Sequence, residues 1–391
     1  MCRPARPREI EASARARAAS EHRTDRGGTT EAPAIDAQPN AGHVERVNPR
    51  LVPAIGALVL AAACSSSSSE TTANPSSASA DAGAADAEAP AAVELLAVAD
   101  LARTGATQAL SATWFDPGTR TLFALQDTEP RIVPLAATDG WKTWTPGAPI
   151  ALTGRPDPTW DGEGLARAGD VFFAVTVETT PLLERFDAAG KYLDRVELPP
   201  HFAKQAPGNK GLESLSLSPS GKFLFTANEA ALVTDGDVAT KTKGTLVRIL
   251  RRDLATGADA EHGYLTEPLG EGTGGDMGVS DVTAIGDDRV LVLERGYQTG
   301  YGNTVRIFVA DLSSPPDEKT PVEKRLVVDL ATLPSDGVRH PAVQPSPILD
   351  NYEALAVGPT LDDGRRVVFV TSDDNASATQ VARVLALALR L

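Results

Sequence analysis

The sequence has few residues that could cross-link the chain or bind a soft metal ion. Among its 391 residues there are two cysteines, Cys2 and Cys64. No cysteine follows residue 64, which excludes a disulfide framework and a cysteine-based zinc site from the rest of the chain. The five histidines leave little for a histidine-rich metal site: His22, His43, His201, His262 and His340.

Positive charge is also scarce. The chain has 37 Lys and Arg against 52 Asp and Glu, which gives a formal net charge of −15. Nucleic-acid binding needs a basic surface, so we expect no nucleic-acid partner. An acidic chain instead suits the binding of cations.

The apolar run at residues 51–63, LVPAIGALVLAAA, is too short to span a bilayer as a helix, which needs about 20 residues. It fits the apolar core of an export signal. The run ends in small residues and Cys64, and this end resembles the lipobox of bacterial lipoproteins, whose cysteine is lipidated and becomes the mature N-terminus. The lipobox usually has a leucine three positions before the cysteine, where this chain has Ala61. The alternative is a buried apolar helix that contains a cysteine.

The segments around this run support the first interpretation. Residues 65–92 are rich in Ser, Ala, Asp and Pro, cannot bury enough surface to fold, and suit a tether behind a lipid anchor. Residues 1–46 have no apolar periodicity, and we hypothesise that translation starts near Val47, so that residues 47–64 are the signal peptide. We therefore expect a cell-envelope protein anchored to the membrane through Cys64, with the outer membrane favoured because Ser65 carries no retention signal.

Residues 93–391 differ in pattern. Their apolar runs are short, β-rich and separated by turn residues, which predicts one all-β domain. A unit of two short strands joined by a hairpin turn occurs five times. Each copy begins and ends on a polar residue, usually a carboxylate: Ser111 to Asp127, Glu163 to Glu178, Glu213 to Glu229, Asp281 to Glu294, and Glu353 to Asp373.

The spacing between copies leaves room for two outer strands in each, and a repeated four-stranded unit is typical of a β-propeller. At about 40–50 residues per blade, this length predicts six or seven blades, with extra blades in the longer gaps after Glu213 and Asp281. The strands near residues 93–101 and 381–391 are expected to close the ring together.

The blade geometry makes a prediction about the carboxylates. The start of the first strand and the end of the second lie on the same face of a blade, near the mouth of the central channel. Eight carboxylates should therefore meet at one rim, with Asp127, Asp374 and Asn375 beside them: Glu163, Glu178, Glu213, Glu229, Asp281, Glu294, Glu353 and Asp373. So many like charges would repel one another unless some are protonated or a cation lies among them.

Oxygen ligands and few histidines indicate Ca²⁺ as that cation. The alternative is that individual carboxylates accept backbone N–H bonds from the next blade.

Four segments carry a resemblance to a known family: WDGEGLA (160–166), NKGLESLSLSPSGKFLFTANE (209–229), GVSDVTAIGDDRVLVLERGY (278–297) and NYEALAVGPTLDDGRRVVFVTSDDN (351–375). Together they resemble the phytase-like family, described as having the esterase-like activity of phytase. The sequence departs from the family pattern at Ala354, where glycine is more usual, and at Ser111, where a carboxylate is expected.

The resemblance implies hydrolysis of phosphoric esters, such as phytate or another small organic phosphate. Bound calcium would neutralise the phosphate and activate a water molecule, with Glu213 or Glu353 as general base. Lys210 and Arg295, which lie in the matched segments, would bind phosphate. Two alternatives remain open: a non-catalytic surface propeller with structural calcium, and a propeller lactonase or sugar-oxidising enzyme. We expect a monomer.

Overall fold

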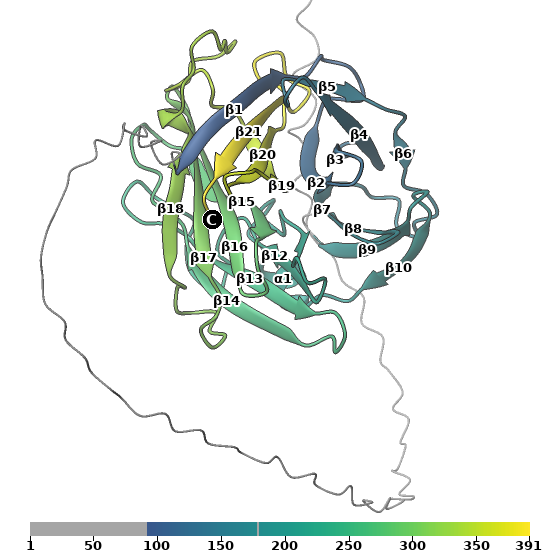
Figure 1. Ribbon diagram of the computed structural model, residues 1–391. Coiled ribbons are helices and arrows are strands. Elements are labelled where there is room, and N and C mark those ends of the chain that lie inside the picture. Colours follow the sequence, from purple (N-terminus) through teal and green to yellow (C-terminus); the bar gives the residue numbers. More distant parts are fainter. Residues whose placement is uncertain (1–91, 178–179) are drawn as a thin grey trace, which may run out of the picture. The chain divides into compact units, whose positions relative to one another are not determined.

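A computed structural model describes residues 92–177 and 180–391 (Figure 1). The predictions for residues 1–46, for the signal peptide 47–64 with Cys64, and for all but the last residue of the tether lie outside this part. None of the helices in the described residues is long and apolar enough to cross a membrane.

The described chain is all-β and forms five antiparallel sheets, which we call blades 1 to 5. Blade 1 has strands β2 (Leu110–Asp116), β3 (Thr121–Gln126), β4 (Arg131–Thr138), β5 (Thr143–Pro146) and β6 (Ile150–Ala151). Blade 2 has β7 (Gly162–Ala168), β8 (Val171–Thr176), β9 (Leu182–Asp187) and β10 (Tyr192–Val196). Blade 3 follows the short helix α1 (Pro200–Gln205) and has β11 (Ser216–Leu217), β12 (Phe223–Ala227), β13 (Leu246–Asp253) and β14 (Asp259–Leu265).

Blade 4 has β15 (Asp276–Ala284), β16 (Arg289–Gln298), β17 (Gly302–Asp311) and β18 (Lys324–Asp329), and the 3₁₀ turn η1 (Leu330–Thr332) follows it. Blade 5 has β19 (Tyr352–Thr360), β20 (Arg366–Ser372) and β21 (Arg383–Leu389), and its fourth strand is β1 (Val93–Asp100) from the start of the domain. The first strands contact one another in the order β2, β7, β11, β15, β19 and back to β2, which closes the ring.

The β-propeller prediction is therefore confirmed, but the prediction of six or seven blades is wrong because there are five. The long gaps hold long strands and connections instead of extra blades. The strands β16 and β17 have ten residues each, and residues 333–351 form an extended connection without regular structure.

The expected closure of the ring is confirmed. Strand β1 pairs antiparallel with β21 from Val93↔Leu389 to Asp100↔Arg383, and the two strands lie side by side in Figure 1. The hairpin turns also form as predicted. Gly221 has φ +72° and Gly364 has φ +81°, a left-handed conformation that glycine adopts without the strain of a side chain.

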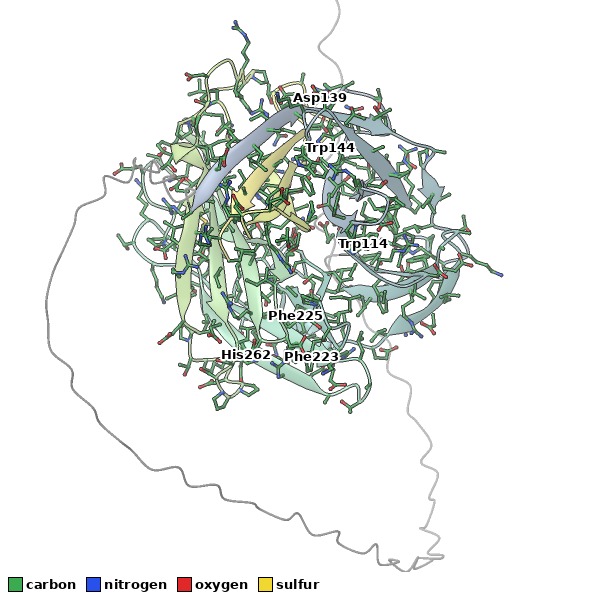
Figure 2. The ribbon with its side chains drawn as sticks, viewed as in Figure 1. Trp114, Asp139, Trp144, Phe223, Phe225 and His262 are labelled. Atoms are coloured by element: carbon green, nitrogen blue, oxygen red, sulfur yellow. The ribbon has the colours of Figure 1, made fainter. Side chains whose placement is uncertain are left out.

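The hydrophobic core consists of layers between neighbouring blades. Five clusters of buried apolar side chains fill the five junctions. Trp144 lies in the junction of blades 5 and 1, and Phe225 lies in the junction of blades 3 and 4 (Figure 2). Because every blade is packed on both faces, the first strands are held in a fixed ring, and that ring sets the positions of the polar side chains at its end.

Candidate functional site

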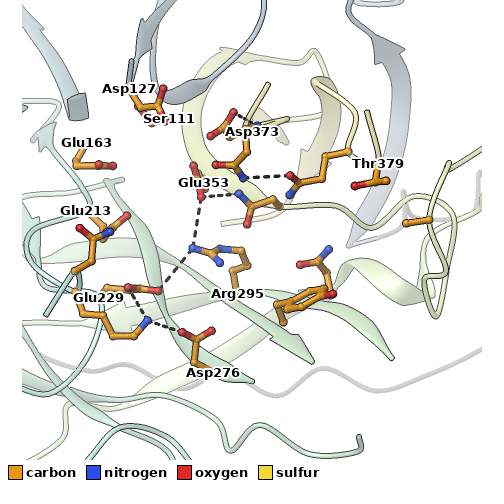
Figure 3. A pocket seen from close by; sticks show the side chains of 18 of the residues that line it. Ser111, Asp127, Glu163, Glu213, Glu229, Asp276, Arg295, Glu353, Asp373 and Thr379 are labelled. Carbon is orange, nitrogen blue, oxygen red and sulfur yellow. Dashed lines mark hydrogen bonds and ion pairs between the residues drawn. The ribbon is translucent and has the colours of Figure 1, made fainter. Parts of the chain in front are cut away.

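All five blades contribute side chains to one pocket of about 590 Å³ (Figure 3). Seven of the ten predicted site residues line it: Glu163, Lys210, Glu213, Glu229, Arg295, Glu353 and Asp373. Asp127 and Asn375, which were expected beside them, line it too. The sequence analysis did not single out Asp161, Asp276, Asn351 or the segment 342–344, which also form part of the wall. Asp161 and Asn351 could have been found, since both lie within the segments that carry the family resemblance.

A β-bulge in the first strand aims side chains at the pocket. In four blades, the pairing of the first two strands skips one residue of the first strand. These skipped residues are Ser111, Glu163, Ser280 and Glu353 in blades 1, 2, 4 and 5. Such a bulge re-aims the extra residue, and Ser111, Glu163 and Glu353 all line the pocket.

The register explains why Asp281 and Glu294 do not line the pocket. In blade 4 the residue that the bulge re-aims is Ser280, and Asp281 is the next residue along the strand. On the second strand, Glu294 pairs with Val279, and the position that holds Asp127 in blade 1 and Asp373 in blade 5 is taken by Arg295. Because side chains alternate along a strand, a shift of one residue turns them to the other face. The expectation that Asp281 and Glu294 would join the rim is wrong for this reason.

The side chains of Asp281 and Glu294 both form hydrogen bonds elsewhere in the structure. Asp281 accepts hydrogen bonds from the backbone N–H groups of Val282 and Leu355, at 2.7 and 2.6 Å, and so joins blade 4 to blade 5. Burial raises the pKa of Asp281 to about 7. Glu294 is buried and accepts hydrogen bonds from Tyr264 Oη at 2.6 Å and Lys324 Nζ at 2.7 Å.

Asp374 was expected beside the rim, and Glu178 on it. Asp374 does not line the pocket, and its Oδ1 accepts bonds from the N–H groups of Ala109 and Ala376. Glu178 lies outside the described residues.

The pocket is strongly acidic, with eight carboxylates and two basic side chains on its wall. The two basic residues lie on the side of blades 3 and 4. Lys210 Nζ is 3.0 Å from Glu229 Oε2 and 2.5 Å from Asp276 Oδ2. Arg295 Nη2 is 3.7 Å from Glu229 Oε1 and 3.5 Å from Glu353 Oε1. Burial opposes the charge on Arg295, but the surrounding carboxylates outweigh it and raise its pKa.

The side of blades 5 and 1 has less compensating charge. Burial raises the pKa of Glu353 to about 7, although Arg295 opposes the shift. Burial, and then repulsion from Glu353, raises the pKa of Asp373 to about 8. Burial also raises the pKa of Asp127, whose Oδ1 is buried and makes no hydrogen bond. These three groups form the part of the pocket where added positive charge would be most stabilising.

The donor chemistry of this part fits a hard cation, because every ligand it offers is an oxygen. The carboxylates, as they lie, do not form a coordination shell. Among residues 92–177 and 180–391, no three Asp, Glu, His or Cys side chains are grouped so that they could hold a metal ion as they lie. A cation bound here would have to draw Asp127, Glu353 and Asp373 together.

Several solved structures are similar to this chain at low identity. An endo-arabinase from Bacteroides thetaiotaomicron is 10% identical over 73% of this chain and 95% of its own, with a TM-score of 0.43. The periplasmic gluconolactonase of Pseudomonas aeruginosa is 13% identical over 71% and 85%, with a TM-score of 0.35. The match to hydrazine synthase from Kuenenia stuttgartiensis is 12% identical, covers 70% of this chain and only 58% of that chain, and has a TM-score of 0.34. With TM-scores below 0.5, these similarities carry no argument about the reaction.

The comparison with family models is more specific. No curated protein matches the chain. The model of the phytase-like family, described as esterase-like activity of phytase, matches residues 105–376. This match covers more than half of the chain and includes blades 1 to 4 and the strands β19 and β20 of blade 5. The chain therefore belongs to the phytase-like family.

Proposed function

We propose that the protein is a calcium-dependent phosphoric-ester hydrolase that acts on a small organic phosphate, with phytate as one candidate, in the acidic pocket. The excess of acidic over basic side chains around Asp127, Glu353 and Asp373 is the observation that carries the proposal. These side chains would hold the calcium ion. When bound, calcium would neutralise the substrate phosphate and acidify a water molecule.

The chain's own residues would then have distinct roles. The pKa of Glu353 is about 7 without calcium, and a bound calcium ion would lower it, so that Glu353 would be ionised near neutral pH and could take a proton from water. Its Oε1 accepts a hydrogen bond from Asn351 Nδ2 at 2.7 Å, which fixes its orientation. Glu213 is the alternative base on the same wall. Lys210 would bind the phosphate, whereas Arg295, enclosed by carboxylates, would chiefly orient Glu353.

The test is phosphate release by the purified protein from phytate and from a simple aryl phosphate, with added calcium and with a chelator. Release should depend on calcium, and Glu353→Gln should lower it by a factor of about 10² or more, which is typical for a general base. Glu267→Gln is the matched control, since Glu267 contacts Lys324 and lies outside the pocket. Release that persists in chelator would contradict the proposal, and release that survives Glu353→Gln would assign the role of general base to Glu213. No release in either condition, from folded protein, would favour the non-catalytic binding propeller.

We also propose export and lipid anchoring at Cys64. The support is the apolar run 51–63, the small residues before the cysteine and the low-complexity tether behind it. In a bacterial host supplied with labelled fatty acid, the protein should incorporate label and fractionate with membranes, and Cys64→Ser should lose both properties. Unchanged labelling of Cys64→Ser would refute the anchor.

A further inference from the structure

A buried histidine–carboxylate pair lies behind the pocket. His340 belongs to the connection 333–351, and its side chain is 2% exposed. Its Nε2 is 2.8 Å from Asp350 Oδ2, and its Nδ1 is 3.0 Å from both the N–H and the carbonyl oxygen of Ala342. Since a carboxylate only accepts, the donor to Asp350 is Nε2–H. The pair thus fastens the middle of the connection to the residues just before β19.

The segment that this pair fastens is part of the pocket wall. Ala342, Val343 and Gln344 line the pocket, and Gln344 Oε1 accepts a hydrogen bond from Asn303 N–H at 2.7 Å. Val343 is 80% exposed, and Tyr297, which pairs with Asn303 across β16 and β17, is 47% exposed and lines the same pocket. We call Tyr297, Ala342 and Val343 the apolar wall, because they add apolar surface to a pocket that is otherwise made largely of charged and amide side chains.

Asp350 also connects the apolar wall to the candidate base. Its Oδ2 accepts a second bond, from Val381 N–H at 2.7 Å, and its Oδ1 accepts one from Asn351 N–H at 2.8 Å. The Asn351 side chain in turn donates to Glu353. One carboxylate therefore sets the position of the wall and of the residue that orients Glu353.

We propose that His340 is a positioning residue that holds Ala342 and Val343 of the apolar wall against the pocket, and that this wall receives an aryl or similarly apolar group next to a ligand's charged group. The choice of a phosphate-like charged group rests on the proposed function. The role of His340 in holding the wall does not.

The rest of the connection is anchored independently of His340. The buried guanidinium of Arg383 donates to the carbonyls of Arg339 and Pro347, at 2.9 and 2.7 Å. Loss of the histidine should therefore release residues 341–343, between Arg339 and the bond of Gln344 to Asn303, without unfolding blade 5. This makes substitution of His340 an informative test.

Three full-length variants separate the roles. His340→Leu removes both polar contacts, and His340→Gln keeps an amide that can donate to Asp350. His201→Leu is the matched control, because His201 also pairs with a carboxylate, Glu261 at 3.1 Å, but lies outside the pocket. The first readout is hydrogen–deuterium exchange at the backbone N–H groups of residues 342–344, followed by mass spectrometry. Exchange should be about tenfold faster in His340→Leu, as expected for the loss of a hydrogen bond to a charged group, and close to wild type in the other two variants.

The second readout is binding of phenylphosphonate and methylphosphonate by calorimetry, with calcium present. Both have the same charged group and a carbon–phosphorus bond, so only the apolar group differs. The unmodified protein should prefer phenylphosphonate by about tenfold or more, from burial of the ring. His340→Leu should lose most of this preference, while His340→Gln and His201→Leu should keep it.

Each result decides a separate point. Equal exchange of residues 342–344 in His340→Leu and His201→Leu would overturn the positioning role. No preference for phenylphosphonate, including no binding of either compound, would overturn the ligand class. A clear preference in a protein that releases phosphate from no ester would leave this inference standing and remove the proposed hydrolase function.

Discussion

Replacing Asp281 by alanine would remove the carboxylate that joins blade 4 to blade 5. The N–H groups of Val282 and Leu355, both on buried residues, would lose their acceptor. A buried donor left without a partner costs about 1–3 kcal/mol, so two of them predict a loss of about 2–6 kcal/mol in the free energy of unfolding. Asp281→Asn keeps one acceptor oxygen and should lose about half as much.

Urea unfolding followed by tryptophan fluorescence measures this loss as a lower midpoint with an unchanged slope. Asp170→Ala is the control, since the Asp170 side chain is 94% exposed, and its midpoint should not move. Equal midpoints for Asp281→Ala and Asp170→Ala would refute the structural role. If Asp281→Ala instead abolished the effect of calcium and left the stability in chelator unchanged, Asp281 would be a metal ligand after all.

Three other predictions concern the pocket and its supports. Burial raises the pKa of Glu353 to about 7 and of Asp373 to about 8, above unfolded values near 4, so the native state retains protons that the unfolded chain releases. In chelator, the free energy of unfolding should therefore fall as pH rises from about 4 to 8, and calcium should make this fall smaller. Denaturant titrations across that range measure it, and a rise in the free energy of unfolding would contradict the prediction. Lys210→Met should raise KM for an aryl phosphate about tenfold or more with a smaller effect on kcat, and an unchanged KM would exclude Lys210 from phosphate binding. Arg383→Leu removes a buried guanidinium that donates to the half-exposed Asp100 of β1 and to the carbonyls of Arg339 and Pro347. It should lower the free energy of unfolding by about 2 kcal/mol or more in a urea titration, whereas a loss below about 1 kcal/mol would show that these bonds are not needed.

Hairpin geometry was enough to predict most of the pocket from the sequence. The turns fix where the first strand begins and the second ends, so Glu163, Glu353 and Asp373 could be assigned to one end of the ring before any contact was known. The four-strand repeat gave the fold class for the same reason. Both predictions depend on local pairing, which the pattern of turn residues reveals.

Register could not be predicted in the same way. A carboxylate one residue from the expected position looks equivalent in the sequence, yet Asp281 follows the bulge and Glu294 lies on the opposite face from Arg295. The position of a bulge depends on how two strands pair, and no particular residue type marks it in this sequence. The predicted number of blades was wrong for a related reason. The length of a gap alone does not show whether its residues form an extra blade or long strands and a connection such as 333–351. The sequence indicated only an ordinary loop residue at His340, because its partner, Asp350, lies ten residues later in a connection without a repeating pattern.

The pairing of β1 with β21 has a consequence for how the ring assembles. Blades 1 to 4 are built from neighbouring segments, so each can pair its strands soon after they are synthesised. Blade 5 is complete only when β21 pairs with β1, which lies nearly 300 residues earlier in the chain. Pairing between such distant segments slows folding. The same pairing brings the start of β1 close to the end of β21. Arg390 N–H donates to the Ala92 carbonyl at 3.0 Å, so a short turn could join the two strands there. A circular permutant opened between β1 and β2 would make every blade continuous, and it should reach the native ring faster than the natural order of strands.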